Sequence, residues 1–378
     1  MTALTQQQRL DCLRLIRSEN VGAVTFSNLM HIYGSAGKAL EALPAMAEKG
    51  GKRAIKVCGI QQAQDEVAAI EKAGAKFVVK GEPEYPRLLG LLSSAPPVLT
   101  YKGGISLGQK PCISVVGTRD CTISGKKMAF QIAKDLCDGG YCVVSGLTRG
   151  IDAAAHEGAL QSQGGGTIGV IGTGIDQVYP QSSDKLHDEI ARRGLILSEF
   201  PYGMGPDRST FPRRNRTVSG LSLGVVVVEA DVESGSMITA RFAKDQGRQV
   251  WAVPGFPLDA KAGGPNELLQ QGAKIVTSAA DIIKLAKDLE KIMVKEPVFP
   301  IFGQKPVALP DEEEMKELRK KVMALLSKTW VTVEEIITET DAPLTMVLIA
   351  LTELELAGKI TRKDGNLICL NYDDKEDL

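Results

Sequence analysis

Residues that bind metals are scarce in this sequence. Its 378 residues include three histidines, which lie far apart, and seven cysteines, which form no C-x-x-C pair. Structural zinc sites usually show such a spacing, so we expect no metal. An odd number of scattered cysteines also argues against a disulfide framework and favours a reducing compartment.

Long apolar segments and an excess of one charge are also missing. No run of about 18 apolar residues could span a bilayer, and residues 1–20 show no charged-then-apolar leader. The net charge is -1 at pH 7, so a site for a polyanion would have to be a local concentration of Arg and Lys. We therefore expect a cytoplasmic protein without membrane contact.

Two segments resemble common nucleotide-binding motifs but lack the sequence context that these motifs require. The glycine pattern at 164–169 fits G-x-G-x-x-G but precedes a predicted strand, whereas a dinucleotide-binding turn follows a strand and opens a helix. Residues 124–127, Ser-Gly-Lys-Lys, lack the upstream glycine and the Ser or Thr after lysine that a P-loop requires. We therefore expect no cofactor and no ATP hydrolysis.

The hydrophobic pattern of residues 1–75 predicts a small helical domain. Amphipathic segments are separated by short turns. The segment 21–34, VGAVTFSNLMHIYG, is typical of half a helix-hairpin-helix, a module that often contacts the DNA backbone. A domain that serves only for packing explains the pattern equally well, and the sequence leaves both readings open.

Residues 76–293 predict an α/β domain with a Rossmann-like, doubly wound and mostly parallel sheet. After a connector that contains several prolines, short apolar runs alternate with amphipathic segments. Each apolar run predicts a strand, the first at 112–117 and the last at 274–278. Repeated strand and helix units produce a parallel sheet with helices on both faces, because the crossovers are right-handed.

The C-terminal part predicts a linker and a third domain. Residues 294–312 contain four prolines and end in acidic residues, a composition typical of interdomain linkers. Residues 313–372 show three helical segments and then a hairpin that turns at Asp364-Gly365. This is the element order of a winged helix.

Residue types that bind phosphate recur where the predicted strands end. The carboxyl ends of parallel strands meet at one edge of the sheet, where ligands bind. Glycine lets a ligand approach the backbone, helix starts attract phosphate, and arginine can bind a phosphate bidentately. Tight turns also use Gly and Ser, but their repetition beside two arginines favours an anion site. The predicted residues are Gly117, Thr118, Arg119, Ser145, Gly146, Arg149, Gly150, Ser234, Gly235 and Ser236.

The segment 208–216 indicates nucleic-acid binding most strongly. It contains four arginines, one aromatic residue and no acidic residue. A phenylalanine can stack on a base while arginines and a helix start hold phosphates, which suits an unpaired strand better than a duplex. A solvated basic turn with a core phenylalanine is the alternative. The predicted contacts are Arg208, Phe211, Arg213, Arg214, Asn215 and Arg216.

A catalytic pair could form at Asp152 and His156, which lie four residues apart on one helix face. No further base or metal ligand is signalled, so structural roles are preferred, with Asp152 at the helix start and His156 bonded to a neighbouring loop. Glu199 and Glu229 end apolar strands and could likewise act as acids, but they can as well anchor arginines such as Arg216. We therefore expect that this protein is not an enzyme.

A series of motifs occurs in order along most of the chain. They are VVGTR (115–119), VVSGLTRGIDAAAHEGAL (143–160), GVIGTGIDQVYP (169–180), SEFPYG (198–203), FPRRNRTVSGLS (211–222), VVEADVESGSMITARFAKDQGRQVWAVPG (227–255) and NELLQQGA (266–273). This series closely resembles the DNA-processing protein A family, also called DprA or Smf. Thr148, where alanine is usual, and Asp120-Cys121 are small departures that remove no phosphate-binding group.

The resemblance implies a binding protein without catalytic activity. Such a protein protects incoming single-stranded DNA and loads the RecA recombinase onto it, helping to displace single-strand-binding protein during natural transformation. The resemblance also implies strand contacts at Arg119, Arg208 and Phe211, and a homodimer that forms through the Rossmann domain.

Two other functions stay open. A nucleotide hydrolase resembling the lysine-decarboxylase-like phosphoribohydrolases would use the loop P-G-G-x-G-T-x-x-E, whose final glutamate is missing after residues 233–239. A purely regulatory α/β module would leave the arginines of 208–216 unexplained.

The predicted third domain lacks the charge of a duplex reader. A DNA-reading winged helix presents Arg and Lys on its third helix, but here that helix, 343–358, carries Glu353 and Glu355 and no basic residue. Only Lys359, Arg362 and Lys363 of the wing could contact phosphate. We expect a protein-contact or accessory role for this domain.

Overall fold

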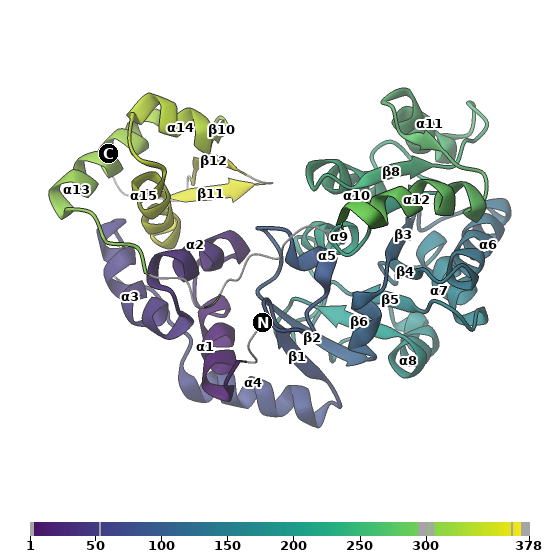
Figure 1. The fold of residues 1–378 in the computed structure, drawn as a ribbon, viewed down its shortest axis with the longest axis horizontal. Coiled ribbons are helices and arrows are strands. Elements are labelled where there is room, and N and C mark those ends of the chain that lie inside the picture. Colours follow the sequence, from purple (N-terminus) through teal and green to yellow (C-terminus); the bar gives the residue numbers. More distant parts are fainter. Residues whose placement is uncertain (1–3, 53, 294–301, 303–305, 364–365, 372–378) are drawn as a thin grey trace. The chain divides into compact units, whose positions relative to one another are not determined.

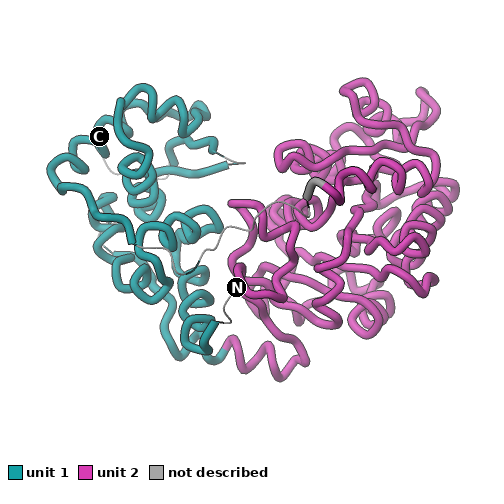
Figure 2. Tube along the Cα trace, viewed as in Figure 1, with its two compact units in different colours: residues 1–65, 300–378 teal, residues 66–299 magenta. Residues whose placement is uncertain are grey.

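The computed structural model describes residues 4–52, 54–293, 302, 306–363 and 366–371. The chain divides into two units, one formed by residues 1–65 with 300–378 and the other by residues 66–299 (Figure 2). Both ends of the chain thus belong to the smaller unit. The predicted turn at Asp364-Gly365 and most of the predicted linker 294–312 lie outside the described residues.

Within the described residues of the larger unit, nine strands form one sheet in the order β1-β2-β6-β5-β4-β3-β7-β8-β9 (Figure 1). Neighbouring strands from β6 to β9 in this order pair in parallel. These strands are β3 (Cys112–Val116), β4 (Cys142–Ser145), β5 (Thr167–Val170), β6 (Leu195–Ser198), β7 (Gly224–Val227), β8 (Gln249–Ala252) and β9 (Lys274–Ile275). The prediction of a doubly wound, mostly parallel sheet is confirmed.

Helices cover both faces of this sheet. One face packs against α6 (Ile123–Asp138), α7 (Ile151–Gln161), α8 (Asp184–Arg193) and α12 (Ala279–Met293), and the other against α5 (Arg87–Gly90), α9 (Thr210–Gly220), α10 (Gly235–Asp245) and α11 (Ala260–Gln270). Successive side chains of a strand point to opposite faces. Val225 and Val226 of β7 accordingly enter two different apolar clusters, and both are fully buried.

The segment predicted as a connector contains two further strands. β1 (Lys76–Val79) pairs antiparallel with β2 (Val98–Gly103), and β2 pairs antiparallel with β6. Prolines 83, 86, 96 and 97 flank these strands and do not interrupt them, which is where a sheet tolerates proline. The prediction for this segment was therefore wrong, because proline frequency concealed two short strands at this end of the sheet.

The smaller unit combines N-terminal helices with a winged-helix domain. The helices are α1 (Gln6–Ile16), α2 (Ala23–Tyr33) and α3 (Ala36–Lys49), and α4 (Ile60–Lys72) crosses the border between the units. The winged-helix domain consists of α13 (Glu312–Leu325), β10 (Val331–Thr332), α14 (Val333–Thr340), α15 (Leu344–Leu356), β11 (Ile360–Lys363) and β12 (Leu367–Leu370). Strand β12 lies between β10 and β11 in a small antiparallel sheet, and the predicted winged helix is confirmed.

Helix α15 packs inside the smaller unit. Asn28 Nδ2 of α2 donates a hydrogen bond to Thr352 Oγ1 at 3.2 Å, and Asn20 Nδ2 donates one to the Leu356 carbonyl at 2.9 Å. Glu353 is 3% exposed, and its carboxylate lies 2.7 Å from Arg319 Nη1 of α13. The third helix of the winged domain therefore contacts this chain itself.

The wing has fewer free cations than the sequence suggests. The Arg362 side chain is nearly buried, and its Nε lies 3.6 Å from the Glu355 carboxylate. Lys363 lies over the Trp330 ring, with its Nζ 5.7 Å from the ring centroid. The expectation that Arg362 is free for phosphate is therefore wrong, since it pairs inward with an acidic residue.

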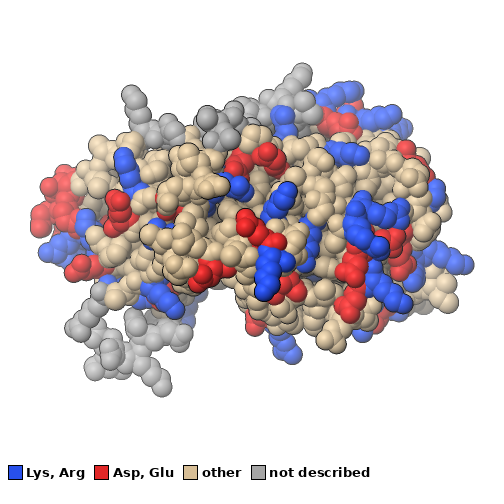
Figure 3. Space-filling view, turned by 90° about the horizontal axis from the view of Figure 1, so that it is seen from below, with Lys and Arg blue, Asp and Glu red and all other residues tan. Residues whose placement is uncertain are grey.

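The surface shows no simple charge pattern on the face in Figure 3. There, basic and acidic side chains of the described residues are interspersed, in line with the net charge of -1 at pH 7. The face in Figure 3 therefore offers no broad basic surface to a polyanion.

None of the helices that the structure describes is long and apolar enough to cross a membrane.

Candidate functional site

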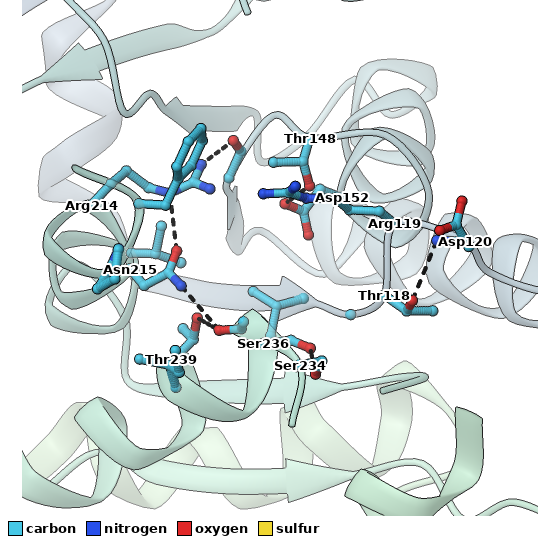
Figure 4. Close-up of a pocket in the computed structure, with 18 residues that line it drawn as sticks. Thr118, Arg119, Asp120, Thr148, Asp152, Arg214, Asn215, Ser234, Ser236 and Thr239 are labelled. Atoms are coloured by element: carbon cyan, nitrogen blue, oxygen red, sulfur yellow. Dashed lines mark hydrogen bonds between the residues drawn. The ribbon is translucent and has the colours of Figure 1, made fainter. Parts of the chain in front are cut away.

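A cavity of about 370 Å³ opens at the carboxyl ends of β3, β4 and β7, between α9 and α10 (Figure 4). Its size lies within the range of small-molecule sites. The predicted residues that line it are Gly117, Thr118, Arg119, Gly146, Phe211, Arg214, Asn215, Ser234, Gly235 and Ser236. The predicted residues outside its lining are Ser145, Arg149, Gly150, Arg208, Arg213 and Arg216.

The start of α10 forms one wall of the cavity. Ser234 is the N-cap residue, and its side chain makes no capping hydrogen bond, so it leaves the first amides of the helix free of a side-chain acceptor. The Ser234 and Ser236 hydroxyls lie 2.8 Å apart, and the first turn holds no acidic residue. A helix start with open N–H groups and two hydroxyls is suited to bind an anion.

Arg119 supplies the exposed cation of the cavity. Its side chain makes no ion pair with any residue that the structure describes, and its Cζ lies 5.4 Å from the centroid of the Phe211 ring. A guanidinium at this distance is attracted to the ring. The guanidinium of Arg119 therefore lies over the Phe211 ring, so that a cation and an aromatic ring adjoin in the cavity.

Arg214 has a different position, although it also lines the cavity. It is 4% exposed, and its Nη1 donates hydrogen bonds to the Gly146 and Val170 carbonyls, the latter at 2.7 Å. Its Nε donates to Asn215 Oδ1 at 3.0 Å. Burial lowers the pKa of the Arg214 guanidinium to about 10, and nearby Asp152 opposes this shift. Arg214 therefore joins the ends of β4 and β5 and shapes the wall.

The other arginines of α9 and of the segment just before it also differ in whether they have an ion-pair partner. Arg216 lies 3.3 Å from the buried Glu199 carboxylate, as predicted, and Arg213 lies 3.7 Å from it. Arg213 remains 58% exposed, with its Cζ 5.2 Å from the Phe200 ring centroid. Arg208 is exposed and has no ion-pair partner within the described part of the chain. Arg208 is thus the free cation closest in sequence to Phe211.

Ser145 and Gly150 support the turns beside the cavity. The buried Ser145 hydroxyl donates to the Val115 carbonyl at 2.7 Å and so joins β4 to β3. Gly150 has φ 83°, and a Cβ there would lie 2.4 Å from the Thr118 carbonyl oxygen, so no other residue fits. Arg149 is exposed, and its Nη2 lies 2.9 Å from Asp120 Oδ1.

Asp152 and His156 do not form an accessible catalytic pair. His156 is fully buried, its Nδ1 lies 2.7 Å from Thr167 Oγ1, and burial lowers its pKa to about 3. Asp152 lines the cavity in the first turn of α7 and accepts a hydrogen bond from Thr148 Oγ1 at 2.7 Å, while burial raises its pKa. A neutral buried imidazole without contact to the cavity cannot act as its base.

Glu229 fixes the loop that carries Arg119. Its carboxylate accepts hydrogen bonds from the Thr122 amide, at 2.8 Å, and from the Thr122 hydroxyl. Thr122 in turn caps α6, while the Glu229 carbonyl accepts a hydrogen bond from the Thr118 amide at 2.6 Å. The loop between β3 and α6 is thereby held at both ends. No cluster of three potential metal ligands exists among the described residues.

Several residues of the site were not predicted. Thr148, Ile238 and Thr239 line the cavity, and Tyr179 contacts the Phe211 ring from outside it, with ring centroids 5.8 Å apart. Tyr179 lies nine residues beyond the end of β5, so a search of the turns directly after strands does not find it. In the structure, its exposure of 43% and its contact with the Phe211 ring mark it as part of the site.

Family models match the chain in three consecutive parts. The model described as "DprA-like N-terminal HHH domain" matches residues 6–69, and "DNA recombination-mediator protein A" matches residues 76–287. The model "DprA winged helix domain" matches residues 305–366. The second model alone covers more than half of the chain.

Similar proteins and structures come from several bacteria. "Protein Smf" of Synechocystis sp. is 33% identical over 320 residues, 78% of this chain and 80% of the relative. "DNA processing protein DprA" of Streptococcus pneumoniae is 45% identical over 199 residues, 53% of this chain and 70% of the relative.

Two solved structures share the fold. The X-ray structure of DprA from Streptococcus pneumoniae has a TM-score of 0.62 and 34% identity, covering 75% of this chain and 98% of that chain. A structure from Helicobacter pylori has a TM-score of 0.51 and 31% identity, covering 57% of this chain and 96% of that chain. It is described as giving insights into the single-stranded DNA binding mode of DNA processing protein A.

Proposed function

The chain belongs to the DNA recombination-mediator protein A family, and we propose that it binds single-stranded DNA in the cavity at the carboxyl edge of its larger sheet. The observation that carries the proposal is the joint position of Phe211, Arg119 and the start of α10 in one cavity. Members of this family process DNA and mediate recombination, which requires contact with unpaired strands.

The geometry favours an unpaired base over a duplex. A base that stacks on Phe211 has to enter the cavity beside Arg119, and a paired base cannot leave its own stack without unpairing. The phosphate of a neighbouring nucleotide can then accept hydrogen bonds from the free amides and the hydroxyls at the start of α10. Base stacking is tolerant of sequence, so binding is expected to be nonspecific.

The relative from Helicobacter pylori supports this proposal. The description of its structure states that it gives insights into the binding mode for single-stranded DNA. The match covers 57% of this chain at 31% identity. A nucleotide hydrolase is not favoured, because His156 is buried and the chain lacks the required glutamate after residues 233–239.

We extend the proposal to protein partners and to a homodimer. The protein loads the RecA recombinase onto strands that single-strand-binding protein covers, and it acts as a homodimer through its Rossmann-like unit. Ile275 of the edge strand β9 is 60% exposed, which supports an interface there. Filament formation by RecA on covered strands should accelerate with this protein present. Sedimentation should show a dimer that Ile275→Lys converts to a monomer.

The proposed binding is tested by fluorescence anisotropy with a labelled oligothymidylate and a duplex of equal length at several salt concentrations. We expect tight binding of the single strand that weakens as salt rises, and much weaker binding of the duplex. Equal affinity for both would contradict the proposal. Release of free base from nucleoside monophosphates would instead favour a hydrolase.

A further inference from the structure

Tyr179 has an unusual position for an aromatic residue. It lies between β5 and the short helix η2 (Gln181–Ser183), and its side chain is 43% exposed. Its ring centroid lies 5.8 Å from that of Phe211, and the two ring planes are inclined at 52°. An exposed ring in contact with a residue of the binding cavity adds apolar surface that the core does not use.

The segment that carries Tyr179 is fixed to its neighbours. The Thr173 hydroxyl donates to the Gln177 carbonyl at 3.0 Å, and the Gly174 amide donates to the Met204 carbonyl at 2.8 Å. The Gly203 amide donates to Asp176 Oδ1 at 2.8 Å. These bonds join the segment to the loop after β6, so little ordering of the backbone is needed when a ligand arrives.

The contacts of Phe211 define a direction along the sheet edge. Arg119 and Arg214 approach its ring within the cavity, whereas Tyr179 contacts the ring but does not line the cavity. Phe211 lies beside the loop after β5, since a Cβ at Gly172 would lie 3.4 Å from its ring, and Tyr179 of the same loop extends the aromatic surface outside the cavity. The tilt between the rings suits two bases that are splayed apart, as in an extended strand.

We propose that Tyr179 is a second base platform, on which the nucleotide next to the one in the cavity stacks. This inference rests on the proposed binding of single-stranded DNA. It makes the site continuous over at least two nucleotides, with Phe211 between the cavity and Tyr179. The tyrosine ring carries the interaction, and the hydroxyl is dispensable.

The test compares two ligands of different length. Tyr179→Ala should weaken binding of a long oligothymidylate roughly tenfold, the effect of one lost base stack. The same variant should leave unchanged the affinity for thymidine monophosphate, which fills only the cavity. Tyr179→Phe should bind the long strand like wild type. Phe256→Ala is the matched control, since Phe256 is 69% exposed and follows another strand, β8.

A crosslinking experiment gives a second readout that does not depend on affinity. Irradiation of the complex with an oligonucleotide containing 5-iodouracil should join Tyr179 to the strand, as mass spectrometry of the peptides would show. The proposal is overturned if Tyr179→Ala binds the long strand like wild type, or if Phe256→Ala loses as much. In those cases the proposed function stands if Phe211→Ala still weakens binding. If wild type binds no single strand, both proposals fail.

Discussion

The guanidinium groups around the cavity differ in what they already bind. Arg214 is buried and bonded to two strand-end carbonyls, and Arg216 is paired with the buried Glu199. Arg119 has no ion pair within the described residues and stays exposed. A ligand phosphate therefore competes with existing partners at Arg214 and Arg216, but not at Arg119.

This difference predicts that two alanine substitutions change stability by very different amounts. Arg214→Ala should lower the free energy of unfolding by about 3 to 5 kcal/mol, because it leaves carbonyls and the neighbouring Asp152 buried without their partner. Arg119→Ala should change it by less than about 0.5 kcal/mol, as a surface substitution. Urea denaturation of both variants measures this. Equal stability of the two would show that Arg214 does not support the wall.

The buried His156 predicts a pH dependence of stability. Burial lowers its pKa from the ordinary 6.5 to about 3, so the unfolded chain binds a proton that the folded protein does not. This group leaves stability unchanged above the unfolded pKa. Below it, the free energy of unfolding falls by about 1.4 kcal/mol per pH unit until the folded pKa is reached.

The variant His156→Asn isolates this contribution. Asn can keep a hydrogen bond to Thr167 Oγ1 but does not titrate. The difference in unfolding free energy between wild type and variant should therefore shrink as pH falls from 7 to 5, because other groups titrate alike in both. A constant difference between the two would mean that the pKa of His156 is the same in the folded protein as in the unfolded chain.

Sequence alone could locate these arginines but could not orient them. The run Arg213-Arg214-Asn215-Arg216 lies on helix α9, where successive residues point about 100° apart. Arg214 thus enters the wall, whereas Arg216 and Arg213 both lie near Glu199, the first half-buried and the second largely exposed. The neighbours on β4, β5 and β6 decide these directions, and they come from other parts of the sequence.

At the scale of elements, α6 and α7 cross very closely. Gly158 of α7 faces the backbone of α6, and a Cβ at this position would lie 2.1 Å from the Phe130 carbonyl oxygen. The same helices form the wall of the core beside β3 and β4. Since α7 begins directly after the loop 146–150, this crossing also sets the position of one side of the cavity.

We predict that Gly158→Ala destabilises the protein, although alanine is the better helix former. The clash should outweigh the gain in helix propensity and cost about 1 to 3 kcal/mol. Thermal or urea unfolding measures the change. As a control, Ala153→Gly in the same helix should cost about 1 kcal/mol through propensity alone. A stabilising effect of Gly158→Ala would show that the helices can move apart freely.

The parallel strands of the sheet were predictable, and the two antiparallel strands at one end of it were not. β3 to β8 are short apolar runs followed by glycine or other turn residues, which predicted them well. β1 and β2 lie in a segment with frequent proline, and their pairing with each other and with β6 depends on contacts distant in sequence. Local pattern carries no information on such pairing.

At the scale of the whole molecule, the cavity belongs to one unit only. All residues that line it lie within 66–299, which has its own apolar core on both sheet faces. The fragment 66–299 should therefore fold and bind oligothymidylate within a few-fold of the full chain. Circular dichroism and fluorescence anisotropy check this. A folded fragment without strand affinity would show that the smaller unit contributes essential contacts.

The winged-helix domain should behave differently in isolation. Its third helix, α15, packs against α2 and α3. The hydrogen bonds that α15 accepts from Asn20 and Asn28 of the N-terminal part are lost in a fragment 313–378. Such a fragment should bind duplex DNA poorly, because the helix that would enter a groove carries Glu353 and Glu355. The sequence showed this charge, but it could not show that the same helix contacts the N-terminal helices.

The central claim is that Phe211 and Arg119 hold an unpaired strand at the carboxyl edge of the sheet. The most direct measurement is the affinity of Phe211→Ala and Arg119→Ala for a labelled oligothymidylate, with Arg192→Ala as control, since Arg192 is an exposed cation near the opposite edge. We predict losses of about 1 to 3 kcal/mol for Phe211→Ala, a comparable loss for Arg119→Ala, and none for the control. Binding like wild type by both cavity variants would contradict the account.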